Sequence, residues 1–415
     1  MQTAVSVIIA SVLLTGLISC SDTADSPAGD VAEAVADGGT ARMARRLGGI
    51  TAAFDPTAHP YANNLRVQHF RDQLEHLLAV GPSDWSSKQA IAAVRLGLAN
   101  ELLLDGQTEA AIEAFGKLFY ETKSRRQRHR LQGLLGLAHL RLGEQDNCFV
   151  NHTIESCLFP IAGEGVHSMQ RGSRAAVSHF EAVLARNPDD LAARWMLNIA
   201  YMTLGEYPGG VPAGQLLGPE LFASDYDIGR FRDVAPALGL DVVGLSGGAV
   251  MEDFDRDGHL DIMASSWGLL DQLRYFRNRG DGTFADLTDA AGLTGVTGGL
   301  NAKQADYDND GYRDLLILRG AWLNRPPATD GGRHPNSLLK NHGGSHFDDV
   351  TEPAGLLTYH PTQTAAWGDY DNDGDLDLFI ANETGRQTPY PSQLFRNDGD
   401  GTFTDVAAQA GAQLD

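Results

Sequence analysis

One motif recurs three times in the second half of this 415-residue chain, always at the same distance from a phenylalanine. Phe231, Phe284 and Phe347 are each followed, 22 residues later, by an aspartate cluster that reads Asp-x-Asp-x-Asp-Gly-x-x-Asp. A fourth phenylalanine, Phe403, opens the same short pattern, and all four are followed by a glycine eight residues later. A spacing this constant indicates repeats of one structural unit that pack against one another.

The three clusters have the spacing of a calcium-binding loop. Calcium takes about six to eight oxygen ligands at roughly 2.3–2.6 Å, and alternate residues of a tight loop can direct carboxylates to one point. Glycine at position six permits the sharp turn, and a backbone carbonyl at position seven and the aspartate at position nine complete the set. A solvated acidic turn could explain one cluster but not three in fixed register. We therefore expect about three calcium ions, held by Asp253, Asp255, Asp257, His259 and Asp261, by Asp306, Asp308, Asp310, Tyr312 and Asp314, and by Asp369, Asp371, Asp373, Asp375 and Asp377.

The flanking residues argue against an EF-hand. That loop needs a glutamate at position twelve and a helix on each side, whereas position twelve is Ala264, Ile317 or Ile380 and the flanks are apolar strand sequences. Magnesium is disfavoured because it prefers octahedral geometry and retains its waters.

The remainder of each repeat is also typical of strands. Leu273–Asn278 and Gly282–Phe284 flank a glycine-containing turn and predict a hairpin, as do the corresponding residues after Leu394. Each repeat then has about four strands, the content of a propeller blade. The segments that begin with the four phenylalanines are predicted to be copies of one strand.

The combination of the aspartate loop with Leu-Phe-Arg-Asn-x-Gly-Asp-Gly-Thr-Phe, near Phe403, resembles the FG-GAP/VCBS repeat over residues 231–415. That repeat occurs in integrin α chains and in bacterial relatives of the cartilage acidic protein family. The resemblance implies a propeller of about seven blades with calcium in its loops, which acts in adhesion or ligand binding rather than catalysis. The literal FG-GAP signature is degenerate, with Ser246–Val250 as its nearest match. A fourth cluster is due after Asp415, so we expect an incomplete propeller of about three blades from a truncated or fragmentary product, with closure by oligomerisation as the alternative.

Residues 61–206 have a helical period, interrupted at Asp105-Gly106, at Gly143 and at Asn187-Pro188. Their paired helices resemble about two and a half tetratricopeptide repeats, which implies a solenoid that contacts a protein or the neighbouring domain. Simple packing on the rest of the chain is the alternative. A linker is expected over 207–230.

An insertion over residues 144–173 contains Cys148 and Cys157. A disulfide is favoured in an exported chain, and a Cys2His2 metal site with His152 and His167 is the alternative. Zinc ligands of this type are usually only two to four residues apart, which disfavours the metal site.

The N-terminus contains an apolar run, Val5–Ile18, that has the length of a signal-peptide core. The run ends in Leu-Ile-Ser-Cys, which resembles the bacterial lipobox and implies lipidation of Cys20. No lysine or arginine precedes it, and an ordinary secretory signal or an uncleaved anchor are the alternatives. We expect a lipoprotein signal over 1–20, a flexible tether over 21–60 and an exported protein of the bacterial cell envelope, periplasmic or at the outer surface.

Composition limits the partners. The chain has 32 Lys and Arg against 54 Asp and Glu, a formal charge of −22, so its surface as a whole repels nucleic acid and anionic lipid. Contact with the membrane is expected only through the anchor. The sequence thus predicts a multidomain α + β protein, non-catalytic, that binds an unknown protein or polysaccharide. The alternative is a propeller-based extracytoplasmic enzyme acting on a surface polymer, for which the candidate residues are His334, His342, His346 and His360.

Overall fold

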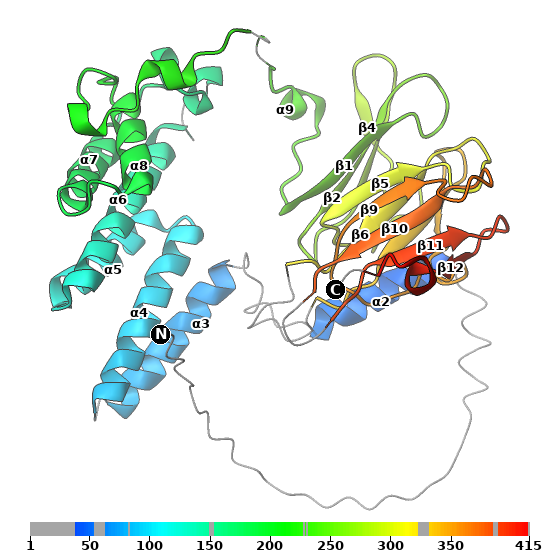
Figure 1. The fold of residues 1–415 in the computed structure, drawn as a ribbon, viewed down its shortest axis with the longest axis horizontal. Coiled ribbons are helices and arrows are strands. Elements are labelled where there is room, and N and C mark those ends of the chain that lie inside the picture. Colours follow the sequence, from blue (N-terminus) through cyan, green and yellow to red (C-terminus); the bar gives the residue numbers. More distant parts are fainter. Residues whose placement is uncertain are drawn as a thin grey trace, which may run out of the picture. The chain divides into compact units, whose positions relative to one another are not determined.

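The computed structural model of the chain describes residues 38–53, 63–81, 84–148, 153–226, 229, 231–322, 332–384 and 389–413. Helices dominate the first part of these residues and strands the second, so the expected α + β organisation is confirmed (Figure 1). The helices are α2 (Gly39–Ala53), α3 (Asn63–Val80), α4 (Trp85–Leu104), α5 (Thr108–Glu121), α6 (Arg125–Cys148), α7 (Arg171–Leu184), α8 (Leu191–Thr203), α9 (Ala235–Leu238) and α10 (Ala407–Ala410).

Local sequence signals set several of the helix ends. Asp84 accepts a hydrogen bond from the backbone N–H of Ser87 and caps the start of α4, because the first N–H groups of a helix have no partner within it. The same helix ends at Leu104, just before the predicted break, where Gly106 has a φ of 78° that few other residues adopt. Asp190 caps α8 in the same way. The two predicted breaks after α4 and α7 are thus confirmed.

The predicted break at Gly143 is wrong, because this glycine lies inside α6. A Cβ on Gly172, in α7, would lie 2.4 Å from the backbone nitrogen of Gly143, so the two helices approach closely at a pair of glycines. Gly143 therefore serves packing between α6 and α7, a role that the sequence of one helix cannot reveal.

The helices bury two cores. One gathers side chains of α4, α5 and α6 around Phe115, and the other gathers α7 and α8 around Phe180 and Leu197. The predicted linker over 207–230 contributes to the second core, because Val211 is buried in it and Leu216 packs against it. The first part of that linker is therefore folded onto the helices.

The strands form three antiparallel sheets of four strands each, and in every sheet the strands are neighbours in chain order. Each sheet is thus an antiparallel meander, in which a short glycine-containing turn joins the third strand to the fourth. The first sheet has β1 (Ser246–Glu252), β2 (Asp261–Ser266), β3 (Arg274–Asn278) and β4 (Phe284–Asp286); the second has β5 (Asn301–Ala305), β6 (Asp314–Leu318), β7 (Ser337–Asn341) and β8 (Phe347–Asp349); and the third has β9 (Thr362–Gly368), β10 (Asp377–Asn382), β11 (Gln393–Asn397) and β12 (Phe403–Asp405).

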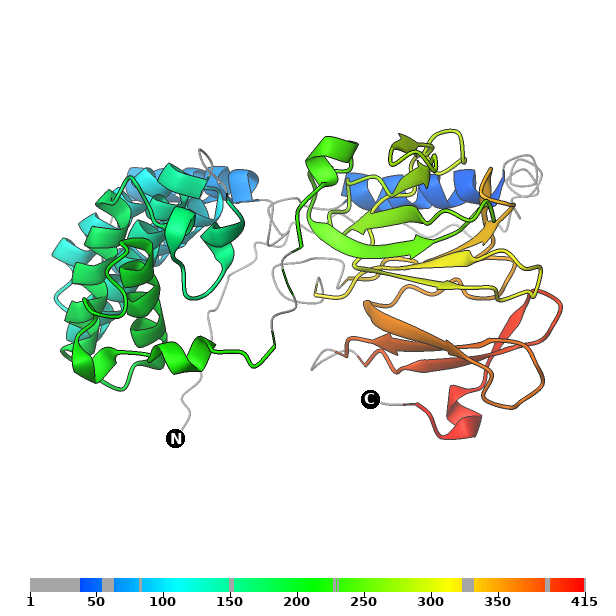
Figure 2. The ribbon, with the colours of Figure 1, turned by 90° about the horizontal axis from the view of Figure 1, so that it is seen from above.

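The three sheets lie side by side, with strand β5 in contact with both β1 and β9 (Figure 2). One core, around Phe254, Tyr275 and Phe347, joins the first sheet to the second, and another, around Leu316 and Phe395, joins the second to the third. The described strands form no closed barrel. The regular packing places the equivalent loop of every sheet at the same end of the array.

The first of the four predicted phenylalanine strands is not a strand. Residues around Phe231 are irregular and lead into α9, and the Phe231 side chain is 89% exposed. The other three copies form β4, β8 and β12, each paired with the third strand of its own sheet. The copies differ in whether a neighbouring strand is present. A strand needs a neighbour to satisfy its backbone hydrogen bonds, and no described strand pairs with residues 231–234.

Part of the predicted tether over 21–60 is also folded. Helix α2 packs against the second sheet, where the Thr40 hydroxyl donates to the carbonyl of Phe347 (3.1 Å) and accepts from the N–H of Asp349 (2.9 Å) (Figure 1). Met43 and Leu47 of the same helix are buried. Arg46 forms two hydrogen bonds of 2.9 and 2.8 Å to Glu352.

Several predictions concern residues outside those described. Cys20 and the signal segment lie there, as do His152 and the side chain of Cys157, so lipidation and the disulfide from Cys148 stay predictions. Among the described helices, none combines the length and apolar composition needed to cross a bilayer.

Candidate metal centres

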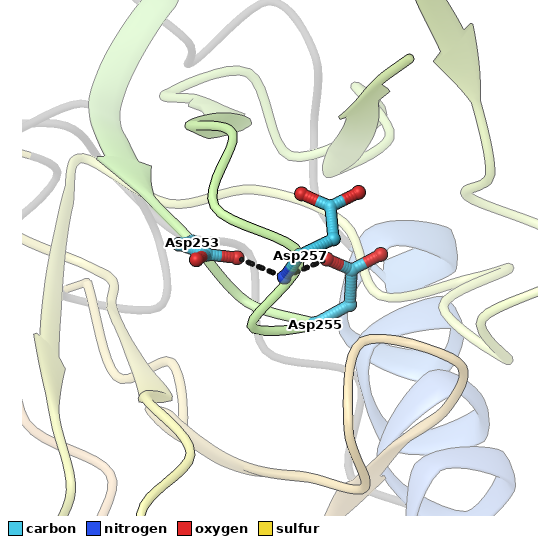
Figure 3. Close-up of side chains that lie close together, drawn as sticks. All are labelled: Asp253, Asp255 and Asp257. Atoms are coloured by element: carbon cyan, nitrogen blue, oxygen red, sulfur yellow. Dashed lines mark hydrogen bonds between the residues drawn. The ribbon is translucent and has the colours of Figure 1, made fainter. Parts of the chain in front are cut away.

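Each aspartate loop connects the first strand of a sheet to the second. The loops follow β1, β5 and β9 and end at Asp261, Asp314 and Asp377, which are the first residues of β2, β6 and β10. Strand flanks on both sides agree with the prediction that these are not EF-hands. Figure 3 shows the first loop, in which the carboxylates of Asp253, Asp255 and Asp257 surround one short stretch of backbone.

The backbone of the three loops has the same unusual conformation. Glycine at position six has a φ of 89°, 89° and 100° in Gly258, Gly311 and Gly374, which explains the glycine that the sequence pattern requires. The backbone at position four is also left-handed, with φ of 60° in Arg256, 58° in Asn309 and 61° in Asn372. The sequence pattern gave no sign of this second position. Two of these three are asparagine, which tolerates that conformation best among side-chain-bearing residues.

Backbone N–H groups of each loop point at its carboxylates. The N–H of the glycine at position six donates to the first aspartate, at 2.9 Å in the first loop, 3.1 Å in the second and 3.2 Å in the third. The N–H of position seven donates to the aspartate at position five at 2.9 Å in all three. These bonds hold the carboxylates in place before any ion binds.

Each loop also brings three carboxylates close enough to share an ion. Ligand oxygens lie within 4.8 Å of one another in three groups, which are Asp253, Asp255 and Asp257; Asp306, Asp308 and Asp314; and Asp369, Asp371 and Asp377. In the second loop, Oδ1 of Asp306 is buried and has no hydrogen-bond donor among the described residues. A buried carboxylate oxygen without a donor is costly. The oxygen-only donor set and this unsatisfied atom fit a hard cation such as calcium.

The aspartates at position nine have a second role that the sequence did not reveal. Asp261, Asp314 and Asp377 are almost fully buried. One carboxylate oxygen of each aspartate accepts a hydrogen bond from the N–H at position two of its own loop. The other oxygen accepts from the N–H of the asparagine that ends the third strand, at 2.7, 2.8 and 2.9 Å. Position nine therefore ties the loop to the sheet.

Burial raises the pKa of Asp314 to about 7, and it raises the pKa of Asp261 as well, because a desolvated carboxylate disfavours its charged form. Carboxylates of the same loop add to this effect, Asp308 for Asp314 and Asp255 for Asp261. A bound cation would offset both causes, since its positive charge favours the ionised carboxylate.

The asparagine at the end of the third strand also connects neighbouring sheets. The side-chain amide of Asn341 donates to the carbonyl of Phe254 in the preceding loop (2.8 Å), and Asn397 does the same to Tyr307 (2.8 Å). Asn278, at the equivalent position of the first sheet, donates within its own sheet to Leu260. The signal was present in the sequence as an asparagine repeated before each hairpin turn, but only the fold shows which carbonyl it meets.

A basic side chain beside each loop was missed as well. Arg277 pairs with Asp255 at 2.7 Å and Lys340 pairs with Asp308, whereas the equivalent Arg396 pairs at 2.6 Å with Asp398, in the hairpin turn after β11. All three immediately precede the repeated asparagine. Arg277 and Lys340 partly neutralise the carboxylates of the first and second loops, which would otherwise repel one another at this distance.

The side chains at position seven point to neighbouring parts rather than to the acidic groups. The Tyr312 ring lies 5.4 Å from the guanidinium carbon of Arg256, in the preceding loop. Asp375 accepts a hydrogen bond from Asn309 of the second loop at 2.8 Å. The position-seven side chains of the second and third loops thus contact adjacent loops. In the first loop, the position-seven residue His259 lies against Gly280.

The four histidines of the enzymatic alternative are divided between two ends of β7. His342 and His346 follow the strand and both contact the exposed carboxylate of Asp348, at 3.2 and 3.0 Å. His334 precedes the strand and is buried, and His360 lies near it, since Pro335 and Tyr359 form an isolated β-bridge. The structure therefore does not gather the four into one group.

Comparison with known proteins identifies FG-GAP-like repeats in the chain, at residues 253–317 and 369–415. Human cartilage acidic protein 1 is 32% identical over 123 residues, which are 29% of this chain and 17% of that protein. The Xenopus tropicalis protein of the same name is 29% identical over 156 residues, or 34% of this chain and 22% of the relative. The chain thus matches about a fifth of the length of these relatives, and the strand-rich part contains FG-GAP-like repeats.

Proposed function

We propose that the chain is an exported, non-catalytic binding protein of the cell envelope whose repeat sheets are propeller blades stabilised by calcium. Its ligand is a protein or polysaccharide, and the helices, interpreted as tetratricopeptide-like hairpins, supply a second contact surface. The anchor in this proposal is a lipid on Cys20. The observation that carries it is the buried, unsatisfied Oδ1 of Asp306 within one of three equivalent acidic loops.

The residues that would hold calcium are those of the three acidic groups. Position five is part of the first group as Asp257, and Asp310 and Asp373 occupy the same position beside the other two. Calcium there would supply positive charge that offsets carboxylate repulsion. Because Asn341 and Asn397 each donate to the loop of the preceding sheet, ordering one loop also supports the next sheet.

The test is thermal unfolding of the purified chain with calcium and with excess chelator, together with metal analysis. An ion that binds only the folded protein stabilises it by roughly 2.7 kcal/mol per site at a hundredfold excess over Kd. We expect a large calcium-dependent rise in Tm and about three bound ions. Asp306→Asn combined with Asp308→Asn should reduce the number of ions by about one.

Asp189→Asn, which removes an exposed carboxylate outside the loops, is the matched control and should leave both results unchanged. Absence of bound calcium and of any shift in Tm would rule out the calcium sites. Calcium binding that is unaffected by the double loop variant would place the ions elsewhere.

A further inference from the structure

The helical part contains a groove whose charge is opposite to that of the chain as a whole. The groove has a volume of about 720 Å³ and lies between α4, the end of α5 and the start of α6. Four cations line it, Lys88, Arg95, Lys123 and Arg130, against one carboxylate, Glu121. A local positive potential on a protein with a net charge of −22 attracts an anionic partner to this place.

Among the described residues, only one of these four cations is paired with a carboxylate. Arg95 pairs with Glu121 at 3.0 Å. Among the residues that the structure describes, Lys88, Lys123 and Arg130 pair with no carboxylate, and all three are exposed. Their charges are therefore available to a ligand at the groove.

Further basic residues lie beyond the groove, and their position at the start of α6 is unfavourable for that helix. Arg125, Arg126 and His129 of the first turns of α6 line an adjacent hollow together with Arg186. The first turn of α6 contains no acidic residue. Cations at a helix N-terminus oppose the helix dipole, and Arg126 and Arg130 repel each other four residues apart. An anionic partner would relieve both effects.

The groove also has an apolar wall. Leu78 is 48% and Trp85 73% exposed, and with Ile91, Leu96, Leu118 and Leu131 they line the same groove. A large aromatic side chain exposed beside cations is typical of a binding surface, because its burial contributes much of the affinity. Apolar side chains between positive charges match a segment in which acidic and apolar residues alternate.

We propose that this groove binds an extended acidic peptide segment of a partner protein, with its carboxylates on Lys88, Lys123 and Arg130 and an apolar side chain against Trp85. A concave, apolar-walled groove suits a peptide better than a flat anionic membrane. The proposal does not depend on calcium, so the binding should persist in chelator.

The test is fluorescence anisotropy of a labelled synthetic peptide of alternating Asp, Glu, Leu and Phe, added to the purified chain with chelator present. We expect binding that weakens several-fold when NaCl rises from about 50 mM to about 500 mM, because salt screens exposed charges. A matched peptide with lysine in place of every acidic residue should not bind.

Three variants locate the binding. Lys88→Glu with Arg130→Glu should weaken it roughly tenfold or more, since each reversal replaces an attraction by a repulsion. Lys88→Arg with Arg130→Lys should retain it, and Trp85→Ala should weaken it without changing its salt dependence, because the charged contacts remain. Arg232→Glu reverses an exposed charge outside the groove and should leave the Kd unchanged within about twofold. Far-UV circular dichroism checks that each variant is folded.

The proposal is overturned if acidic and basic peptides bind alike or if the double reversal leaves the Kd of the acidic peptide unchanged. It is also overturned if phosphatidylglycerol vesicles bind through Lys88 and Arg130 while the peptide does not, which would make the groove a membrane contact. If the loop variants lose calcium but still bind the peptide normally, the peptide-binding proposal stands, because it does not depend on calcium.

Discussion

The asparagines that end the third strand of each sheet differ in burial and in partners, although their sequence contexts are alike. Asn341 and Asn397 are buried and reach the preceding loop, whereas Asn278 is partly exposed and bonds within its own sheet. Single residues therefore decide how firmly neighbouring sheets are joined.

This difference gives a matched comparison. Asn341→Ala should lower the free energy of unfolding by about 2–4 kcal/mol, because it removes the donor to the buried carbonyl of Phe254 and a further bond to the carbonyl of Arg313. Asn278→Ala should cost only about 1 kcal/mol. Urea denaturation in the same buffer measures both, and equal losses would show that the bond between sheets contributes nothing.

A histidine inside the helices should make that part sensitive to acid. Burial lowers the pKa of His139 from 6.5 to about 4, aided by His179, whose ring stacks on it at 5.3 Å. The folded pKa is below the unfolded one, so the unfolded chain binds more protons between these values and the free energy of unfolding falls as pH drops from about 6.5 to about 4. The loss should be on the order of 1–2 kcal/mol, after allowance for solvent screening.

Urea denaturation followed by far-UV circular dichroism across this pH range measures the effect. His139→Gln should make the dependence less steep but not remove it, because burial also lowers the pKa of His167 and His179. His76→Gln, at an exposed position of α3, should leave it unchanged. A wild-type slope retained in His139→Gln would assign the acid sensitivity to other groups.

At the scale of elements, α2 shows how a segment outside the repeats can pack against one of the sheets. Its buried stripe of Thr40, Met43 and Leu47 has the spacing of one helix face. The surrounding sequence of small and polar residues favoured a tether, because helix propensity near three glycines is low. Packing against the second sheet compensates for that weak propensity.

Two adjacent positions of α2 should therefore respond in opposite directions. Leu47→Ala should lower the free energy of unfolding by about 2–4 kcal/mol through a cavity in the buried face. Gly48→Ala, with nothing within 4 Å of the added Cβ, should raise it by about 0.5–1 kcal/mol through helix propensity. Denaturant midpoints compare the two, and no effect of Leu47→Ala would mean that α2 does not stabilise the sheets.

At the scale of the whole molecule, the helices and the sheets bury separate cores. Calcium should then stabilise the sheets without affecting the helices. Hydrogen–deuterium exchange should show calcium slowing the exchange of amides in β1–β12 and leaving those of α3–α8 unchanged, because bound ligand suppresses only the openings that release it. Equal protection of helices and strands would instead show that the two parts unfold as one unit.

The sequence alone determined the features that depend on short-range spacing. Three aspartate loops, their flanking strands, the glycines of their turns and the ends of α4 and α7 shortly before Asp105 and Asn187 follow from residues a few positions apart. These signals are local because they concern which φ, ψ and side-chain directions a short segment can adopt.

Tertiary structure decided the features that depend on a distant partner. Phe231 has the sequence of a strand but finds no described neighbour, Gly143 looks like a stop but accommodates α7, and Asn341 meets a carbonyl 87 residues away. Residues 39–53 look like a tether and fold on the second sheet. In each case the stabilising contact joins segments that are far apart in the sequence, and periodicity within one segment contains no information about what will lie against it.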